Sequence, residues 1–235
     1  MLEKVATRRV RDISFEIRTG EIVGLGGLVG AGRSEVARAI IGEDPLLAGR
    51  MEVAGRAFSP ASPADAIKAG IGLVPEDRKQ EALLLMQAVR DNVSLVVPDK
   101  VSHFGFYDRR RETELVSHHV AELRVKTPTI NQAVSKLSGG NQQKVIFARW
   151  QARGPRILIL DEPTRGIDVG AKAEIYRLVE SLADNGMAIL LISSEMSELL
   201  GLSDRVLVMQ GGRITGEVDG DNATEERILD LAMQA

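Results

Sequence analysis

The sequence predicts an α/β protein with a mostly parallel sheet, and three stretches carry this prediction. Residues 157–160 and residues 187–192 are uninterrupted apolar runs, the first of them ending in Asp161 and Glu162. Short, partly β-branched runs of this kind are typical of parallel strands buried on both faces. A third run, residues 22–25, leads into a glycine-rich segment and then a helix, which is the order found around phosphate-binding loops.

The glycine-rich segment fits the pattern G-x-x-x-x-G-K-[ST] from Gly27 to Ser34, with Arg33 where lysine belongs. Backbone N–H groups in such a loop cradle phosphates, and the Ser34 hydroxyl is expected to reach Mg²⁺. The residues expected to contact nucleotide here are Gly27, Gly30, Ala31, Gly32, Arg33, Ser34 and Glu35. Arginine is a longer, planar cation than lysine. Glu35 either places a negative charge near the phosphates or is an ordinary acidic residue in the first turn of a helix. For the segment as a whole, the alternative is a glycine-rich turn with no phosphate role.

Two carboxylates follow the run at residues 157–160. In open α/β sheets, ligands bind at the carboxyl ends of the strands. We therefore expect Asp161 to hold a hydrated Mg²⁺ ion. Glu162 is the candidate general base for an attacking water. Two solvated acids at a strand end are the alternative interpretation.

The tetrapeptide 138–141, Ser-Gly-Gly-Asn, precedes a predicted helix over about residues 142–151. Ser138 is a plausible N-cap, and Gly139 and Gly140 leave backbone N–H groups bare. A helix that begins with bare amides is a potential anion site. A simple turn and cap is the alternative.

Several other stretches complete the predicted organisation. Residues 13–17 and 22–23 are expected to form two antiparallel strands joined by a turn. Residues 80–136 are helical in tendency, with a long amphipathic candidate over residues 109–123, so we interpret them as a helical subdomain inserted in one domain spanning residues 1–235. The apolar residues 83–86 favour core over interface. The adjacent His118 and His119 are not expected to share a helix face, which makes solvated side chains the preferred interpretation over a metal site.

Composition narrows the class of protein. The chain has 235 residues, a formal net charge of −3 and no cysteine. This charge gives no support for nucleic acid as the main partner. Disulfides and thiolate metal sites are excluded, and no apolar run approaches the length of a membrane span.

The combination of LSGG, a helix, a buried strand and Asp-Glu resembles the signature motif and Walker B strand of ABC-type ATPases. The resemblance covers about residues 10–217 and implies a P-loop ABC-type core, with an N-terminal antiparallel β subdomain and the helical insert. The stretches PEDRK at 75–79, LSGGNQQK at 137–144, DEPTRGIDVGAK at 161–172 and SSEM at 193–196 are similar to ATPase subunits of bacterial sugar importers. The arginine in the glycine loop matches the second of their two tandem domains, so we expect a C-terminal half of a longer subunit.

The resemblance also implies site roles. ATP and Mg²⁺ are the expected cofactors, and Ser138, Gly139 and Gly140 would meet the γ-phosphate bound by a second ABC ATPase domain, whether a tandem half or an identical copy. Asp168 would lie at the seam between the two domains. Glu76 stands where related proteins carry a glutamine that senses Mg²⁺ and water, and Ser194 stands where they carry a γ-phosphate-contacting histidine. For Glu76 the alternative is a charged surface turn. For Ser194 the alternative is an N-cap for a helix beginning at Glu195.

The function implied is ATP binding and hydrolysis coupled to carbohydrate import at the cytoplasmic face of the inner membrane. Residues 80–97 would contact membrane permease subunits, and a periplasmic sugar-binding protein would be an indirect partner. The substitutions at residues 33, 76 and 194, and the lack of an aromatic residue before Ile13 to stack on adenine, imply a degenerate site with slow turnover. A catalytically silent structural module and a soluble ABC ATPase acting on nucleic acid are the competing interpretations.

Overall fold

The computed structural model describes residues 1–103 and 105–233. Within them the chain forms two compact units. The first comprises residues 1–73, 156–162 and 179–235, and the second comprises residues 74–155 and 163–178. The predicted phosphate loop, Asp161 and Glu162 belong to the first unit, whereas the segment 138–141 belongs to the second.

The larger sheet of the first unit has the strand order β12-β11-β3-β10-β9-β6. Its strands are β3 (Ile22–Gly27), β6 (Ile71–Val74), β9 (Ile157–Asp161), β10 (Ala188–Ile192), β11 (Arg205–Gln210) and β12 (Arg213–Asp219). Strand β10 runs parallel to both β3 and β9, β11 runs parallel to β3, and β12 is antiparallel to its neighbour β11. All of β10 is buried, as expected for a parallel strand covered on both faces. The mostly parallel sheet predicted from the apolar runs is confirmed.

The register of this sheet brings three strand ends together. Ile192 of β10 pairs with Asp161 of β9 on one side and with Leu25 of β3 on the other. The chain leaves β3 into the glycine-rich loop, leaves β9 into Glu162, and leaves β10 into Ser193. The three predicted site segments of the first unit therefore leave the sheet at one edge.

The smaller sheet is antiparallel, in the order β2-β1-β4-β5. It consists of β1 (Leu2–Ala6), β2 (Ile13–Phe15), β4 (Ala48–Val53) and β5 (Arg56–Phe58). The expected pairing of residues 13–17 with residues 22–23 is wrong, because β2 pairs with β1 instead. Strand β3 has parallel partners on both edges, β10 and β11, so no edge is left for β2.

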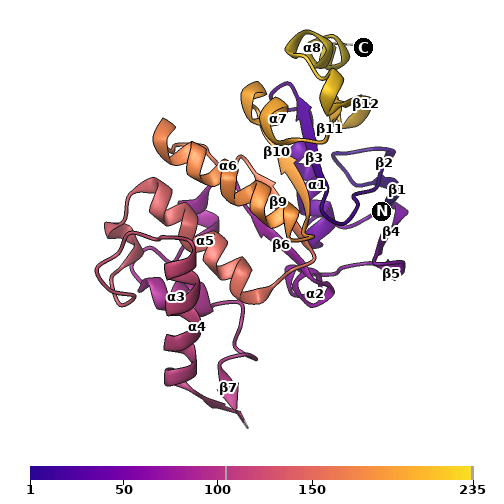
Figure 1. Ribbon diagram of the computed structural model, residues 1–235. Helices are drawn as coiled ribbons and strands as arrows, with labels where there is room; N and C mark the ends of the chain where they lie inside the picture. Colours follow the sequence, from indigo (N-terminus) through magenta and orange to yellow (C-terminus); the bar gives the residue numbers. More distant parts are fainter. Residues whose placement is uncertain (104, 234–235) are drawn as a thin grey trace. The chain divides into compact units, whose positions relative to one another are not determined.

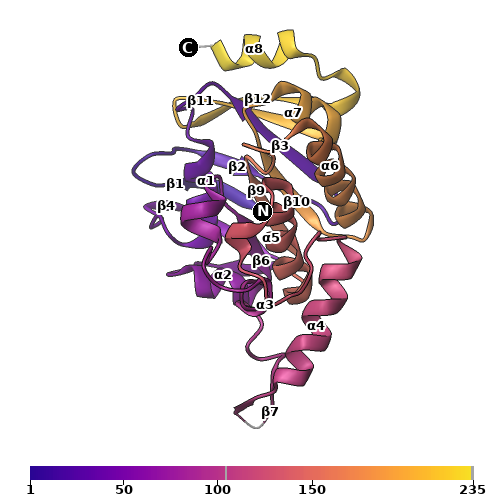
Figure 2. The same cartoon turned by 90° about the vertical axis from the view of Figure 1, so that its left-hand side faces the viewer.

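The helices of the first unit cover both faces of the larger sheet. Alternate residues of β11 divide between two cores: Leu207 and Met209 pack with the smaller sheet and α1 (Arg33–Ile41), while Val206 and Val208 pack with α7 (Met196–Leu202) and α8 (Glu225–Met233). This division follows the two-residue period of a strand. Figure 2 shows α7 and α8 beside β11 and β12. Helix α2 (Pro63–Ala69) and a 3₁₀ turn (Gly220–Asn222) complete this part of the chain.

The second unit is mainly helical, and in it α5 packs against α3 and α4 (Figure 1). Its elements are a π-helical turn (Arg78–Ala82), α3 (Val89–Ser94), the short strands β7 (Ser102–His103) and β8 (Phe106–Tyr107), α4 (Arg109–Glu122), a 3₁₀ turn (Val134–Lys136) and α5 (Gly139–Arg153). Helix α6 (Val169–Asp184) begins in this unit.

The apolar residues 83–86 do not all lie in the core. Leu83 is buried, but Leu84 is 48% and Met86 82% exposed, so the preferred core interpretation is wrong for these two side chains. In the parts of the chain that the structure describes, no helix has the length and apolar character needed to cross a bilayer.

Candidate nucleotide site

The glycine-rich loop of the first unit leaves β3 and ends at Gly32, the N-cap residue of α1. Gly27 and Gly32 have φ angles of 145° and 100°. A Cβ on Gly27 would lie 2.3 Å from the carbonyl oxygen of Met209, so the loop requires glycine there. Because the first amides of a helix have no partners within it, α1 presents N–H groups and a positive dipole end directly after this loop. This is the local structure that binds phosphate.

Arg33 turns toward the ends of two neighbouring strands. Its Nη1 donates a hydrogen bond of 2.5 Å to the carbonyl oxygen of Ser193. Its Nη2 lies 3.7 Å from Oε1 of Glu162, and the two side chains are only 10% and 11% exposed. The planar guanidinium can make both contacts at once because its donors point in different directions. Arg33 therefore supplies the nearby positive charge for the candidate general base.

Asp161 ends β9 in a buried position beside the loop. The carboxylate is 6% exposed and accepts a hydrogen bond from the Ser34 side chain. Burial raises the pKa of the Asp161 carboxyl to about 6, and the negative charge of Glu162 adds to this shift. Among the described residues, Oδ1 of Asp161 has no hydrogen-bond partner. An unpartnered carboxylate oxygen next to a serine hydroxyl suits the oxygen ligands that Mg²⁺ takes.

Glu162 adopts an unusual backbone conformation. Its φ angle is +48°, in the left-handed region that residues other than glycine rarely adopt. Its N–H donates to the carbonyl oxygen of Ile192 at 2.9 Å, so the neighbouring strand holds the residue in place. Backbone strain of this kind is often found at functional sites.

Glu35 and Ser194 are two further predicted residues of the first unit. Glu35 lies in the first turn of α1 and forms an ion pair with Arg9 at 3.1 Å. Ser194 is exposed, and the alternative interpretation of it as a helix N-cap is wrong. Helix α7 starts one residue later than expected, with Glu195 at the N-cap position, and the Ser193 hydroxyl accepts from the Glu195 N–H. The phosphate role of Ser194 stays a prediction.

In the second unit, a charged cluster gathers around Glu76. Glu76 forms an ion pair with Arg165. Arg78 donates from Nη1 to the Arg165 carbonyl oxygen at 2.6 Å and from Nη2 to the Gly166 carbonyl oxygen at 3.1 Å. Asp77 accepts from the N–H groups of residues 79 and 80, which starts the π-helical turn. The loop after β6 is thereby bonded to the loop that precedes α6.

Ser138 is exposed and occupies the N-cap position of α5, as predicted. The helix begins at Gly139, earlier than residue 142, and the Ser138 side chain does not cap it. Its hydroxyl instead accepts from Nδ2 of Asn141 at 2.8 Å, so a side-chain cap is the wrong interpretation. The first amides of α5 lack partners within the helix, which leaves them able to bind an anion.

Close packing explains the two glycines after Ser138. A Cβ on Gly139 would lie 2.9 Å from Nη2 of Arg78, and one on Gly140 would lie 2.7 Å from the Ala171 side chain. Asp168 is exposed and accepts at Oδ1 from the Ala171 N–H at 3.0 Å, which caps the start of α6. Its location at a seam with a second domain stays a prediction.

Sequence reasoning missed the roles of Arg78 and Arg165. Both side chains lie inside stretches that were singled out, PEDRK and DEPTRGIDVGAK. The sequence does show that each stretch contains a basic residue close to acidic ones, and this could have indicated a charged cluster. Their contacts link residues 87 and 88 positions apart, a separation that local patterns do not report.

Replacing Arg78 with alanine is expected to loosen residues 163–170 locally. Two charge-assisted hydrogen bonds would be lost, about 1–2 kcal/mol in total after solvent exposure is allowed for. Hydrogen–deuterium exchange of this segment should become about tenfold faster. Arg78→Lys should recover only part of the protection, because one ammonium does not bridge two carbonyls in the manner of a guanidinium. Arg109→Ala, at an exposed arginine, is the control, and equal exchange in both alanine variants would contradict the prediction.

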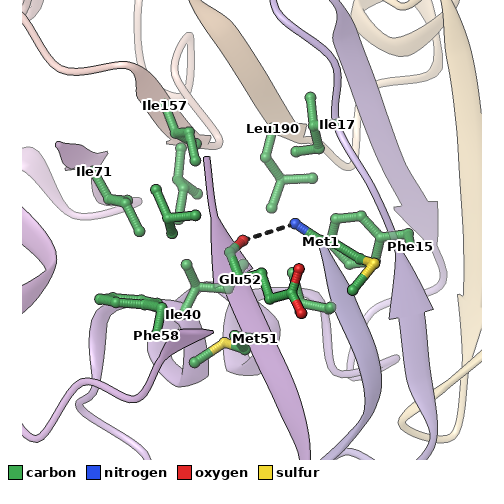
Figure 3. Close-up of a pocket in the computed structure, with 13 residues that line it drawn as sticks. Met1, Phe15, Ile17, Ile40, Met51, Glu52, Phe58, Ile71, Ile157 and Leu190 are labelled. Carbon is green, nitrogen blue, oxygen red and sulfur yellow. Dashed lines mark hydrogen bonds between the residues drawn. The ribbon is translucent and has the colours of Figure 1, made fainter. Parts of the chain in front are cut away.

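A pocket elsewhere in the first unit has different chemistry. Of its 13 lining residues, all but Glu52 are apolar, including Phe15, Ile40 and Leu190. Figure 3 shows these side chains around the opening, where the Met1 amino group donates to the Glu52 carbonyl oxygen at 2.9 Å. An apolar lining with one acid is unsuited to a triphosphate, so we place the candidate nucleotide site at the glycine loop.

The loop, the buried Asp161 and the order of the strands define the class of protein. The chain matches the ABC transporter family over residues 10–165, and it belongs to that family. It is 58% identical over 97% of its length to the ribose import ATP-binding protein RbsA 2 of Mesorhizobium japonicum. It is 48% identical over 94% of its length to the ribose import ATP-binding protein RbsA of Bacillus subtilis. The chain spans 45% of the length of each of these relatives.

Solved structures of ATP-binding cassettes share the fold. A nucleotide-free cassette from an ABC transporter superposes with a TM-score of 0.82 at 20% identity, covering 100% of this chain and 98% of that one. A dimeric cassette in a post-hydrolysis state with ADP and Pi superposes with a TM-score of 0.79 at 20% identity, covering 93% and 97%. The ABC-type P-loop fold expected from the motifs is confirmed.

Proposed function

We propose that this chain is an ATP-binding domain of an importer for ribose or a related sugar. The observation that carries the proposal is the unpartnered Oδ1 atom of the buried Asp161, whose carboxylate bonds to Ser34, beside a glycine loop whose geometry suits phosphate. The two relatives with ribose import in their names support the choice of a sugar as cargo.

In this proposal, the main-chain N–H groups of the glycine loop and of the α1 start hold the phosphates of ATP. Ser34 and Asp161 hold Mg²⁺, which neutralises phosphate charge when it is bound. Glu162 accepts a proton from the attacking water. Glu76 and Ser194 occupy the positions expected to sense the metal and the γ-phosphate.

We further propose that this domain's own site turns over slowly. Arg33, at the position expected for a phosphate-binding lysine, bonds to Ser193 and approaches Glu162. While it holds these partners, the guanidinium is directed at strand ends. Missing or misdirected charge at such a site lowers turnover by orders of magnitude. The same contacts favour the second candidate, a catalytically silent module.

A second ABC ATPase domain is the proposed partner at Ser138, Gly139, Gly140 and Asp168. The exposed Ser138 at the start of α5 supports this proposal, because the bare amides of that helix suit a γ-phosphate held by another domain. The relatives are about twice as long as this chain, which favours a second domain within the same longer protein over an identical copy.

Membrane permease subunits are the proposed partners of residues 80–97. Leu84 and Met86 are exposed there, and exposed apolar side chains of this kind mark interaction sites when they gather in a patch. The domain would act at the cytoplasmic face of the inner membrane, with a periplasmic sugar-binding protein as an indirect partner. Crosslinks from the permease to a different segment would contradict this assignment.

Steady-state phosphate release by the purified chain tests the slow-site proposal. We expect slow turnover that falls further in Glu162→Gln and rises about tenfold or more in Arg33→Lys, since a lysine ammonium is the usual phosphate contact. In the Arg33→Lys/Glu162→Gln double variant, the increase in turnover caused by Arg33→Lys should vanish. Fast turnover by the unmodified chain that Glu162→Gln abolishes would overturn the slow site. No binding of millimolar Mg²⁺-ATP would favour the silent module, and filter binding of nucleic acid would favour the nucleic-acid alternative.

A further inference from the structure

We propose that His118, His119 and Glu122 form a binding site for a divalent transition-metal ion of the zinc type at the C-terminal end of α4. The three residues each offer one ligand atom, and these atoms all lie within 4.8 Å of one another. The site belongs to the second unit and uses none of the residues proposed for nucleotide.

The distances suit one shared ion. Nε2 of His118 lies 3.7 Å from Oε2 of Glu122, and Nδ1 of His119 lies 3.2 Å from the same oxygen. Zinc bonds to nitrogen and oxygen of about 2.0–2.2 Å in a tetrahedron put ligand atoms roughly 3.4 Å apart. The ligand atoms already lie within 4.8 Å of one another, so none has to come closer to another by more than about 1.4 Å. Three protein ligands also leave the fourth position of the tetrahedron for water.

The convergence of two adjacent histidines has a simple geometric cause. Residues next to each other on a helix point in different directions, which is why the sequence did not predict that they meet. Glu122 is four positions after His118 and three after His119, so it neighbours both. Each imidazole leans toward the one carboxylate, and the ring centroids lie 5.0 Å apart with an interplanar angle of 68°. The two adjacent side chains leave the helix in different directions, as expected, and both rings nevertheless reach the Glu122 carboxylate.

The surroundings of the cluster favour a cation. The three residues lie in the last turns of α4, which ends at Glu122, and the C-terminal end of a helix carries a partial negative charge. The Lys100 ammonium acts electrostatically on the His119 ring. Lys100 also opposes a bound cation. Imidazole with a carboxylate suits zinc, copper and nickel better than Mg²⁺.

Accessibility sets the expected strength of the site. His119 is 17% exposed and so has a restricted position, whereas the side chains of His118 and Glu122 are 71% and 48% exposed. An ion can therefore enter from solvent without unfolding the helix. The chain has no cysteine and only three histidines, so few other side chains compete for a soft metal.

Zinc titration of the purified chain by calorimetry tests the proposal. Excess Mg²⁺ is kept present and nucleotide left out, so that sites made only of oxygen ligands are occupied. We expect one saturable Zn²⁺ site in the micromolar range, weakened about tenfold or more in His118→Ala, His119→Ala and Glu122→Gln. His103→Ala is the matched control, because it removes the third histidine, which belongs to β7. Co²⁺ should give the visible absorption of a four-coordinate ion in the unmodified chain and in the control.

Three outcomes would overturn this site. One is unchanged Zn²⁺ affinity in the His118→Ala/His119→Ala double variant. Another is loss of affinity in only one of the two single histidine variants, which would exclude a shared ion. The third is the lack of saturable binding below millimolar Zn²⁺. Circular dichroism of each variant shows whether α4 remains folded, and because ATP turnover is not the readout, the result does not depend on the proposed transport function.

Discussion

Replacing Ser138 with arginine is expected to lower ATP turnover by the paired domains about 100- to 1000-fold, the range found when one preorganised donor to a developing charge is lost. Ser138 is exposed and its side chain bonds only to Asn141 among the described contacts, so the change should leave the fold intact. A long side chain at the start of α5 would keep another domain's phosphate away from the helix amides. The measurement is steady-state phosphate release by this chain together with its second ATPase domain.

The matched control for this change is Ser135→Arg. Ser135 is also exposed and lies three positions before Ser138, in the 3₁₀ turn that precedes α5. It adds the same charge and bulk without covering the start of the helix. Turnover that falls equally in both variants would mean that general charge or folding effects are responsible. Unchanged turnover in Ser138→Arg would contradict the proposal that α5 completes a site in another domain.

Replacing Asp161 with asparagine is expected to raise the free energy of unfolding by roughly 3 kcal/mol at pH 7.5. Burial raises the pKa of this carboxyl from 3.8 to about 6 in the folded chain, a shift of about two units at about 1.4 kcal/mol each. Between these pKa values the native state binds more protons than the unfolded state, so its stability falls as pH rises from about 4 to about 6 and then levels off. Asparagine carries no charge that burial would desolvate, so the variant does not lose stability in this way as the pH rises.

Urea unfolding at pH 7.5 and pH 4.5 measures the effect. The difference between the variant and the unmodified chain should be large at the higher pH and should shrink at the lower one. Asp184→Asn, at an exposed aspartate on the end of α6, is the control and should change stability little at either pH. Adding Mg²⁺ should stabilise the unmodified chain more than Asp161→Asn, since a neutral amide oxygen holds the ion less strongly than a carboxylate. A variant less stable than the unmodified chain at pH 7.5 would contradict the assigned cost of burial.

The parallel core was predictable because residues 157–160 and 187–192 are apolar throughout, which leaves little ambiguity about their burial. Strand β1 was not predicted, and its sequence explains why. Lys4 has a φ angle of +49°, and the pairing of β1 with both neighbours shifts register around it. Such a bulge interrupts the alternation on which strand prediction depends. The partner of β2 was missed for that reason.

Some parts of the candidate site could be predicted from the sequence and others could not. The glycine loop and Ser138 could be located because backbone groups bind phosphate at a helix start, and the sequence shows where helices start. The direction of the Arg33 side chain could not be predicted, because its partner Ser193 is 160 positions away in the sequence. The same is true of Arg78, which bonds to carbonyl oxygens of a distant loop. Which partner a long cation takes depends on tertiary packing, and the residue type alone does not determine it.

The shared register of β9 and β10 makes the orientation of the candidate site acid Asp161 depend on the number of residues in β9. Because successive residues of a strand face opposite sides, deleting a single residue from 157–160 would carry the carboxylate of Asp161 to the far side and bring a different neighbour opposite Ile192. A deletion of two residues would keep the Asp161 side chain on the same side of the sheet but would shorten the strand. Tolerated length changes in homologous chains should therefore accumulate in the connection at residues 184–187, outside both strands. An odd-numbered gap inside β9 would be expected only in proteins that have given up this chemistry.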